Sequence, residues 1–168
     1  MTKKAVIFRQ TINAQSLFFF LCFALLFSCS KREQKVLIFS KTAGFRHASI
    51  EAGATALKAL YESEGMQTVL TEDAAYFTED SLGQFAAVVF LNTTGDVLDP
   101  TQQADFERYI QAGGGFVGIH AATDTEFHWP WYNQLVGAYF DGHPAIQEAE
   151  LHCVKIEDAC CQHLPEVW

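Results

Sequence analysis

The sequence predicts an α/β domain built on a doubly wound, mainly parallel sheet. Short apolar runs at 35–40, 85–91 and 116–119 alternate along the chain with longer amphipathic stretches, as strands alternate with helices in this class. The runs are continuously apolar, as expected of strands buried on both faces of a parallel sheet. The 168-residue chain is 49% hydrophobic and 18% charged, which is a globular composition with enough apolar residues for one core.

The first strand is expected at 35–40, and it leads into a loop at 41–47. A helix should follow, with Ser49 as its N-cap and an end near Gly65. Helical spacing predicts an inward stripe made of Ile50, Ala54, Leu57 and Leu60. A second short strand is expected at 67–71, and residues 74–84 should form a loop with a brief helix.

The next buried strand is expected at 85–91, with a polar loop at 92–96 after it. Asp99-Pro100 is typical of an N-cap and a first helical position, and Gly113 should end that helix. The strand at 116–119 then stops at His120, in a turn crowded by small residues. A further helix is expected at 129–137 and an extended, partly alternating segment at 146–156.

The N-terminus predicts a targeting segment. Basic residues precede an apolar run at 17–27, which is short for a bilayer span but suits a signal peptide. The sequence Leu26-Phe-Ser-Cys29 resembles a bacterial lipoprotein cleavage box. We therefore expect a signal peptide at 1–28, lipidation of Cys29, a tether at 29–34 and a folded domain at 35–168. This predicts a lipid-anchored protein of the bacterial cell envelope, with a secreted or periplasmic protein as the alternative.

Charge and cysteine content limit the partners. The formal net charge is -9 and no Lys/Arg cluster is present, which argues against a nucleic-acid partner. Cys153, Cys160 and Cys161 would meet an oxidising compartment, where Cys153 could pair with one of the other two. No cysteine spacing predicts a zinc knuckle, and the sequence does not indicate the oligomeric state.

Three polar loops should converge on one edge of the sheet. The loops with Arg46 and His47, with Asn92 and Asp96, and with His120 all follow strands. In doubly wound sheets, ligands bind outside the carboxyl ends of the strands, where the strand order reverses. We therefore expect these loops to form one crevice.

The candidate site centres on His120 as general base, with Asp124 to orient it. The alternative for His120 is a hydrogen-bonded histidine beneath a loop, and the alternative for Asp124 is a helix N-cap. Substrate contacts are expected from Arg46, His47, Asn92, Asp96, Trp129 and Trp131. Solvated loop positions and aromatic core packing are the competing interpretations. His120 and His143 could also hold a divalent metal, but no H-x-x-H or H-E-x-x-H spacing supports this. Apart from this possible metal, the sequence leaves the cofactor unknown.

Several separated motifs resemble the ThuA-like family, named for trehalose utilisation. They are Lys35–Ser40, Ala43–His47, Gly113–Asp124, Trp129–Tyr132, Leu135–Phe140 and His143-Pro144. The resemblance implies a flavodoxin-like fold of the class I glutamine amidotransferase type and a role around sugar metabolism. True amidotransferases carry a nucleophilic cysteine at the elbow where this chain has His120, so glutaminase chemistry is not expected. Family members continue past the point that matches 163–168, which predicts a chain truncated at its C-terminus.

Three functions remain open from the sequence. The first is a sugar-acting enzyme for a disaccharide such as trehalose, or an oxidised derivative of one. The second is a non-catalytic, surface-anchored carbohydrate-binding or scaffolding module. The third is a metal-dependent hydrolase.

Overall fold

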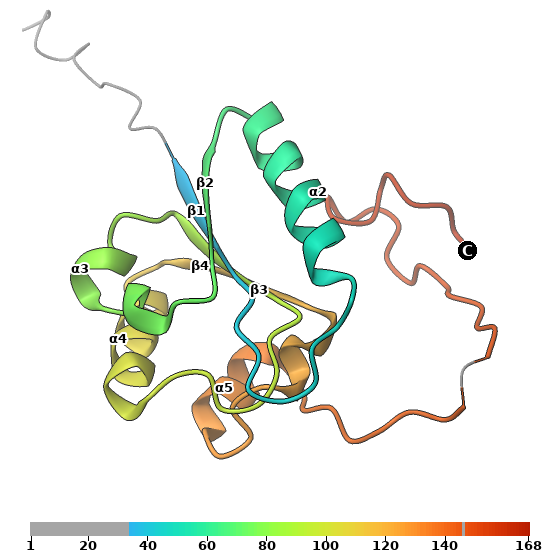
Figure 1. Cartoon of the computed structure of the whole chain (residues 1–168). Helices are drawn as coiled ribbons and strands as arrows, with labels where there is room; N and C mark the ends of the chain where they lie inside the picture. Colours follow the sequence, from blue (N-terminus) through green and yellow to red (C-terminus); the bar gives the residue numbers. More distant parts are fainter. Residues whose placement is uncertain (1–33, 146) are drawn as a thin grey trace, which may run out of the picture.

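The computed structural model describes residues 34–145 and 147–168. The expected signal peptide, Cys29 and all but the last residue of the tether lie outside the described residues. The elements follow in the order β1 (Lys35–Phe39), α2 (Ile50–Ser63), β2 (Gln67–Thr71), the 3-10 turn η1 (Ala74–Tyr76), α3 (Glu79–Leu82), β3 (Ala87–Leu91), α4 (Pro100–Gln111), β4 (Gly115–Ile119), the 3-10 turn η2 (His120–Asp124) and α5 (Pro130–Val136). Figure 1 shows their arrangement.

The described strands form one parallel sheet in the order β2-β1-β3-β4, as the sequence predicts. Ile38 of β1 is in register with Leu70 of β2 on one side and with Val89 of β3 on the other. The chain leaves β1 for β2 at one edge and then returns to β3 on the other side of β1. The carboxyl ends of β1 and β3 therefore flank the point where strand order reverses, which is where such sheets bind ligands.

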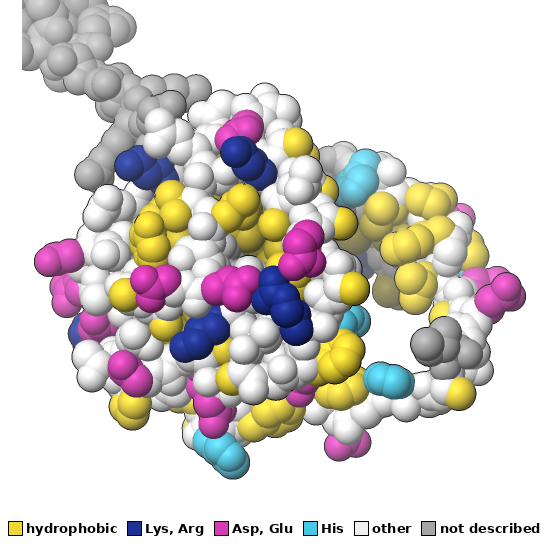
Figure 2. Space-filling model, viewed as in Figure 1, with side chains coloured by type: hydrophobic (Ala, Val, Ile, Leu, Met, Phe, Trp, Pro, Cys, Tyr) yellow, Lys and Arg dark blue, Asp and Glu magenta, His cyan; other side chains and the backbone are white. Residues whose placement is uncertain are grey.

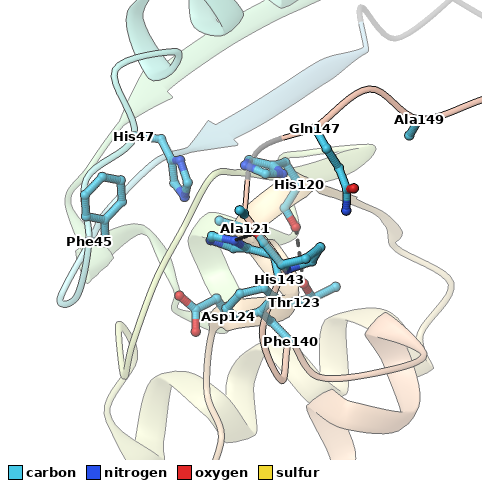
Figure 3. A pocket seen from close by; sticks show the side chains of 12 residues that line it. Phe45, His47, His120, Ala121, Thr123, Asp124, Phe140, His143, Gln147 and Ala149 are labelled. Atoms are coloured by element: carbon cyan, nitrogen blue, oxygen red, sulfur yellow. Dashed lines mark hydrogen bonds between the residues drawn. The ribbon is translucent and has the colours of Figure 1, made fainter.

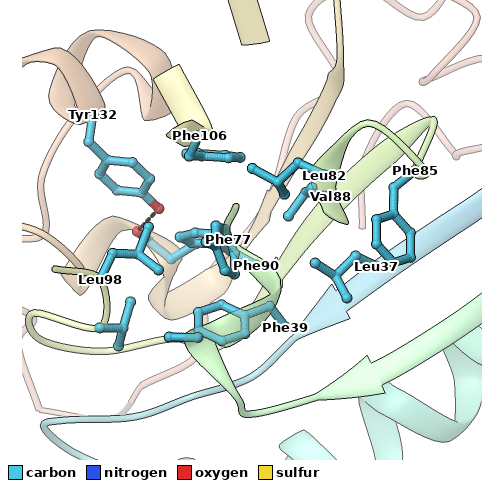
Figure 4. Close-up of a cluster of buried hydrophobic side chains, with 13 residues drawn as sticks. Leu37, Phe39, Phe77, Leu82, Phe85, Val88, Phe90, Leu98, Phe106 and Tyr132 are labelled. Atoms are coloured by element: carbon cyan, nitrogen blue, oxygen red, sulfur yellow. Dashed lines mark hydrogen bonds between the residues drawn. The ribbon is translucent and has the colours of Figure 1, made fainter. Parts of the chain in front are cut away.

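One face of the sheet carries the larger core (Figure 4). Side chains of β1 and β3, such as Phe39 and Phe90, pack there against Phe106 of α4 and Tyr132 of α5, and all four are fully buried. The Phe90 ring stacks on that of Phe106 with centroids 5.5 Å apart. Burying an aromatic side chain contributes about 2–3 kcal/mol, so this cluster stabilises α4 and α5 beneath the loops that follow β3 and β4.

The opposite face of the sheet is covered by α2. Ala54 and Leu57 pack against Val36, Val89 and their neighbours, as the helical spacing predicts. The prediction for Leu60 is wrong, because its side chain is 57% exposed. The cluster beneath α2 is small, with Val36, Ile38, Val89 and Leu91 as its buried members, and Leu60 lies outside it.

Both predicted helix starts lie where expected, but they are capped differently. The Asp99 carboxylate accepts hydrogen bonds from the backbone N–H groups of Thr101 and Gln102, and the Asp99 backbone N–H donates one to the side-chain oxygen of Gln102. This capping box holds α4. Ser49 occupies the N-cap position of α2, but its side chain makes no cap. Its hydroxyl instead accepts a hydrogen bond of 2.8 Å from Asn92 Nδ2.

The C-terminal segment departs from the prediction. No strand forms in the described part of 146–156. Residues 151–153 instead pair with 166–168 around an isolated antiparallel bridge between His152 and Val167. Figures 1 and 2 show this segment arching away from the body of the domain and leaving an opening. Among the described helices, none has both the length and the apolar character that a membrane crossing requires.

Candidate functional site

The turn at the end of β4 has the geometry of a strained elbow. His120 has φ 52°, a left-handed conformation that costs a non-glycine residue about 1 kcal/mol. The turn is crowded, because a Cβ added at Gly118 would lie 3.2 Å from the Cβ of Ala122. The Tyr132 hydroxyl donates a hydrogen bond of 2.8 Å to the Ala122 carbonyl and holds the turn from below. The sharp bend expected at His120 is therefore present.

Backbone hydrogen bonds join the three loops that follow β1, β3 and β4. The N–H of Ala43 donates to the carbonyl of Thr94 over 2.7 Å, and the N–H of Gly95 donates to that of Asp124 over 2.8 Å. The N–H of Glu126 in turn donates to the carbonyl of Gly95 over 3.2 Å. The loops thus form one continuous rim at the carboxyl edge of the sheet, as predicted.

Two imidazoles meet on this rim. The rings of His47 and His120 lie edge to face, with centroids 4.7 Å apart and an interplanar angle of 68°. Phe45 packs on the other side of His47, with centroids 4.9 Å apart. His120 therefore presents its ring to the rim rather than to the core. The alternative of a satisfied histidine buried under a loop does not describe it, because its side chain is exposed.

A cavity of about 870 Å³ opens beside the two imidazoles (Figure 3). Its size lies within the range of small-molecule sites. It is lined by Phe45, His47, His120, Ala121, Thr123, Asp124, Phe140, His143, Pro144, Ala145, Gln147 and Ala149. Apolar surface predominates, and the polar groups are three imidazoles, one carboxylate, one hydroxyl and one amide. Small apolar walls with a few convergent polar groups are typical of sites for organic ligands.

Asp124 lines the cavity, but it does not orient His120. No hydrogen bond between the two side chains is found in the described part of the chain, and Figure 3 shows the carboxylate well apart from the imidazole. The N-cap alternative is also wrong, since Asp124 closes η2 and the N-cap of α5 is Trp129. The Asp124 side chain is thus available to a ligand in the cavity.

The structure places three other expected contacts outside the cavity lining. Arg46 forms ion pairs of 2.9 Å with Glu51 and with Glu72 at the surface. Asn92 has φ 51° and is only 3% exposed, with its side chain directed to Ser49. Asp96 is exposed on the turn beyond it.

The two tryptophans behave as core residues. Trp129 and Trp131 stack on each other with centroids 5.1 Å apart. Both pack edge-on against Phe106 of α4, with centroids 6.4 and 6.2 Å away. Neither lines the cavity. Aromatic packing, the alternative interpretation of this motif, is therefore what the structure shows.

His143 lines the cavity, and one of its ring nitrogens, Nδ1, lies 2.9 Å from the carbonyl of Pro144. If Nδ1 carries the proton and donates it there, Nε2 is left as an acceptor. Within residues 34–145 and 147–168, no group of three or more His, Cys, Asp or Glu side chains is placed to hold a metal ion. The expected pairing of His120 with His143 thus has no third ligand among these residues.

A buried carboxylate near the rim was not anticipated. Glu126 is 1% exposed and has φ 55°. Its Oε1 accepts hydrogen bonds from the backbone N–H groups of Val97 and Leu98, and its Oε2 accepts one of 2.6 Å from Gln103. Burial raises the pKa of this carboxyl, and the three donors only partly oppose that effect. Glu126 therefore fixes the loop after β3 against the segment after β4.

Sequence reasoning also missed most of the other lining residues, among them Phe45, Phe140 and Gln147. Phe45 lies within the Gly-Phe-Arg-His motif at 44–47 and Phe140 just before Gly142-His143. The neighbouring residues Arg46, His47 and His143 carry ionisable groups that suggest a site, whereas a phenylalanine in a sequence gives no comparable indication. Gln147 has no signal in the sequence, because it reaches the cavity only through the course of the C-terminal segment.

Comparisons with known proteins agree with this fold. The solved structure of a putative ThuA-like protein from Bacteroides uniformis is similar with a TM-score of 0.69 and 24% identity. The match covers 83% of this chain but 59% of that one, so this chain spans well under two thirds of its length. A search of functionally curated proteins gave no match. The family model for ThuA, trehalose utilisation, matches residues 35–168, and the chain therefore belongs to the ThuA family.

Proposed function

We propose that this domain acts on a carbohydrate, either a disaccharide such as trehalose or an oxidised derivative of one, in the cavity beside His47 and His120. The observation that carries the proposal is the edge contact of these two imidazoles, 4.7 Å apart, at a cavity of about 870 Å³. Membership of a family described by trehalose utilisation supports the class of ligand.

Two neighbouring imidazoles are suited to proton transfer. One neutral ring can accept a proton from a sugar hydroxyl while the other, protonated, donates one to a departing or carbonyl oxygen. Asp124 and Gln147 would bind hydroxyl groups, and the rings of Phe45 and Phe140 would lie against the C–H faces of the sugar. Glutaminase activity is not proposed, because the elbow carries His120 and none of the described cysteines lines the cavity.

The proposal is tested with calorimetry and a product assay on one panel of sugars and oxidised sugars. His47→Ala and His120→Ala should each lower turnover at least a hundredfold, the usual worth of a general acid or base. The matched control is His128→Ala, since His128 is an exposed histidine that does not line the cavity. Full turnover in His120→Ala, with the fold intact, would contradict a catalytic role for His120.

A second candidate is a binding module without catalysis. The observation in its favour is that no carboxylate among the described residues forms a hydrogen bond with His120, whereas catalytic imidazoles are commonly held by one. This reading predicts saturable sugar binding with no product for any sugar, and weaker binding in Phe45→Ala or Asp124→Ala. Product formation by the wild-type protein would dismiss it. We do not propose the metal-dependent hydrolase, because the described residues offer no three-ligand group.

We further propose that the domain is held at the bacterial cell envelope by a lipid on Cys29. The support is the apolar run at 17–27, whose end overlaps the sequence Leu26-Phe-Ser-Cys29 that resembles a lipoprotein cleavage box. In cells, the wild-type protein should fractionate with membranes and should incorporate labelled fatty acid, whereas Cys29→Ser should do neither. Label in Cys29→Ser, or soluble wild-type protein, would contradict the anchor.

A further inference from the structure

The outer edge of β4 is open in the described part of the chain, where β4 is the last strand on its side of the sheet. The N–H of Gly115 and the carbonyl of Ile119 both make hydrogen bonds to residues that flank β3, over 3.0 and 3.3 Å. The backbone groups of successive residues in a strand point to opposite sides. Phe116 and Gly118 therefore direct their N–H and C=O groups away from β3, toward the open edge.

β4 carries none of the features that usually protect a strand edge. Those features are charged residues, prolines and bulges. The sequence of β4 is Gly-Phe-Val-Gly-Ile, and its five residues pair with β3 in unbroken register. Val117 lies on the same face of the sheet as Ile119, which packs into the cluster beneath α2. Val117 itself is 42% exposed, so the cover that α2 provides ends before it.

The strand at the opposite edge of the sheet is protected. β2 is polar at Gln67, Thr68 and Thr71. The acidic residues Glu64, Glu72 and Asp73 flank it. Pairing two copies of β2 side by side would bring these like charges toward one another, which is destabilising. Of the two edges, only that of β4 suits a second copy of the same chain.

β4 is also complementary to itself. In an antiparallel pair with a two-fold axis at Val117, Phe116 falls opposite Gly118 of the second copy, and Gly115 falls opposite its Ile119. Each large side chain thus meets a glycine, an arrangement that favours pairing at strand edges. Phe116 and Gly118 form the hydrogen-bonded pairs, so every outward N–H and C=O group of the strand gains a partner. The two Val117 side chains meet at the axis.

We propose that two copies of this chain associate through antiparallel pairing of their β4 strands, which joins the two sheets across a two-fold axis. The interface uses the same patch on both copies, as closed dimers require. It buries the exposed side chain of Val117 and fixes the strand that ends at His120. Since only five residues of each copy pair directly, the interface is small and the dimer dissociates on dilution.

Cross-linking tests the register. The experiment uses the full chain in mild detergent, with its five cysteines replaced by serine so that neither lipid nor native thiols contribute. Val117→Cys is added and oxidised with glutathione disulfide. The Cα atoms of a non-hydrogen-bonded antiparallel pair lie about 4.5 Å apart, which is within disulfide range. The control is Leu70→Cys on β2, where the native side chain is 44% exposed. Val117→Cys should form disulfide-linked dimers at least tenfold faster.

Sedimentation over roughly a hundredfold range of protein concentration tests the dimer without a cross-link. Val117→Lys places like charges at the axis and should raise the dimer dissociation constant at least tenfold, whereas Leu70→Lys should leave it unchanged. Circular dichroism checks that both variants fold. Hydrogen exchange of the Phe116 and Gly118 amides in the wild-type strand should slow as the dimer forms, and this measurement decides the question even if Val117→Lys does not fold.

Three results would overturn the proposal. The first is a monomer at every concentration. The second is an assembly that Leu70→Lys weakens as much as Val117→Lys does, or one that grows beyond two copies. The third is protection of the Phe116 and Gly118 amides in the monomer, because the chain's own residues would then cover β4.

Discussion

The strained backbone at His120 makes a prediction about stability that does not depend on knowing the substrate. Replacing His120 by Ala or by Gly removes the imidazole equally, so the difference between the variants reports the backbone alone. At φ 52° an Ala side chain is strained and Gly is not. We expect the free energy of unfolding of His120→Gly to exceed that of His120→Ala by about 1 kcal/mol.

The assay is urea unfolding of both variants at one pH, followed by circular dichroism, with a common m-value as the check that the unfolded states are comparable. Thr123 supplies the matched control, since its φ is not positive and it lies in the same turn. There the order should reverse, with Thr123→Gly about 0.5–1 kcal/mol less stable than Thr123→Ala. If His120→Gly is no more stable than His120→Ala, the elbow is not strained and the reasoning fails.

Three further changes test the supports of the site. Burial raises the folded-state pKa of Glu126 above its unfolded value. The protonated side chain therefore contributes to the free energy of unfolding below about pH 4, and this contribution is lost as pH rises through the folded-state pKa. As the pH rises above about 4, unfolding titrations of Glu126→Gln should therefore show a smaller fall in the free energy of unfolding than those of the wild type. Gly114→Ala would place a Cβ 2.3 Å from the Tyr109 ring, and the melting temperature should drop by an amount equivalent to about 1–3 kcal/mol. Trp131→Ala should lower the free energy of unfolding by about 2–3 kcal/mol, measured by denaturant unfolding, but leave the Kd of the folded protein for a bound sugar unchanged. Weaker sugar binding by this variant would indicate that Trp131 contacts the ligand after all.

The sequence predicted those parts of the fold that local chemistry decides. The runs that became β1 and β3 are apolar over 36–39 and 87–91, because both faces of these strands are covered. Asp99-Pro100 predicted the start of α4, since a capping carboxylate and a proline need only their nearest neighbours. The convergence of the loops followed from topology, because all parallel strands end at one edge of a sheet.

What the sequence could not predict depends on which distant surface each side chain meets. Trp129 and Trp131 are as suited to a sugar platform as to a core, and only the position of Phe106 on α4 decides between these roles. Arg46 is adjacent to His47, yet its longer side chain reaches Glu51 and Glu72 on the outer surface. Leu60 has the correct helical phase, yet it is exposed and lies outside the cluster that α2 forms with the sheet.

Strain and hydrogen bonding together explain why the rim is preorganised. Asn92, His120 and Glu126 all have φ between 51 and 55°, and all lie in the loops after β3 and β4. Three such residues cost about 3 kcal/mol together, a large share of the 5–15 kcal/mol that stabilises a domain. The Asn92–Ser49 bond and the three donors to Glu126 offset that cost by tying the bent segments to one another. His47 and His120 can therefore face each other before any ligand binds. A loop free to relax to negative φ would turn the imidazole of His120 away from that contact.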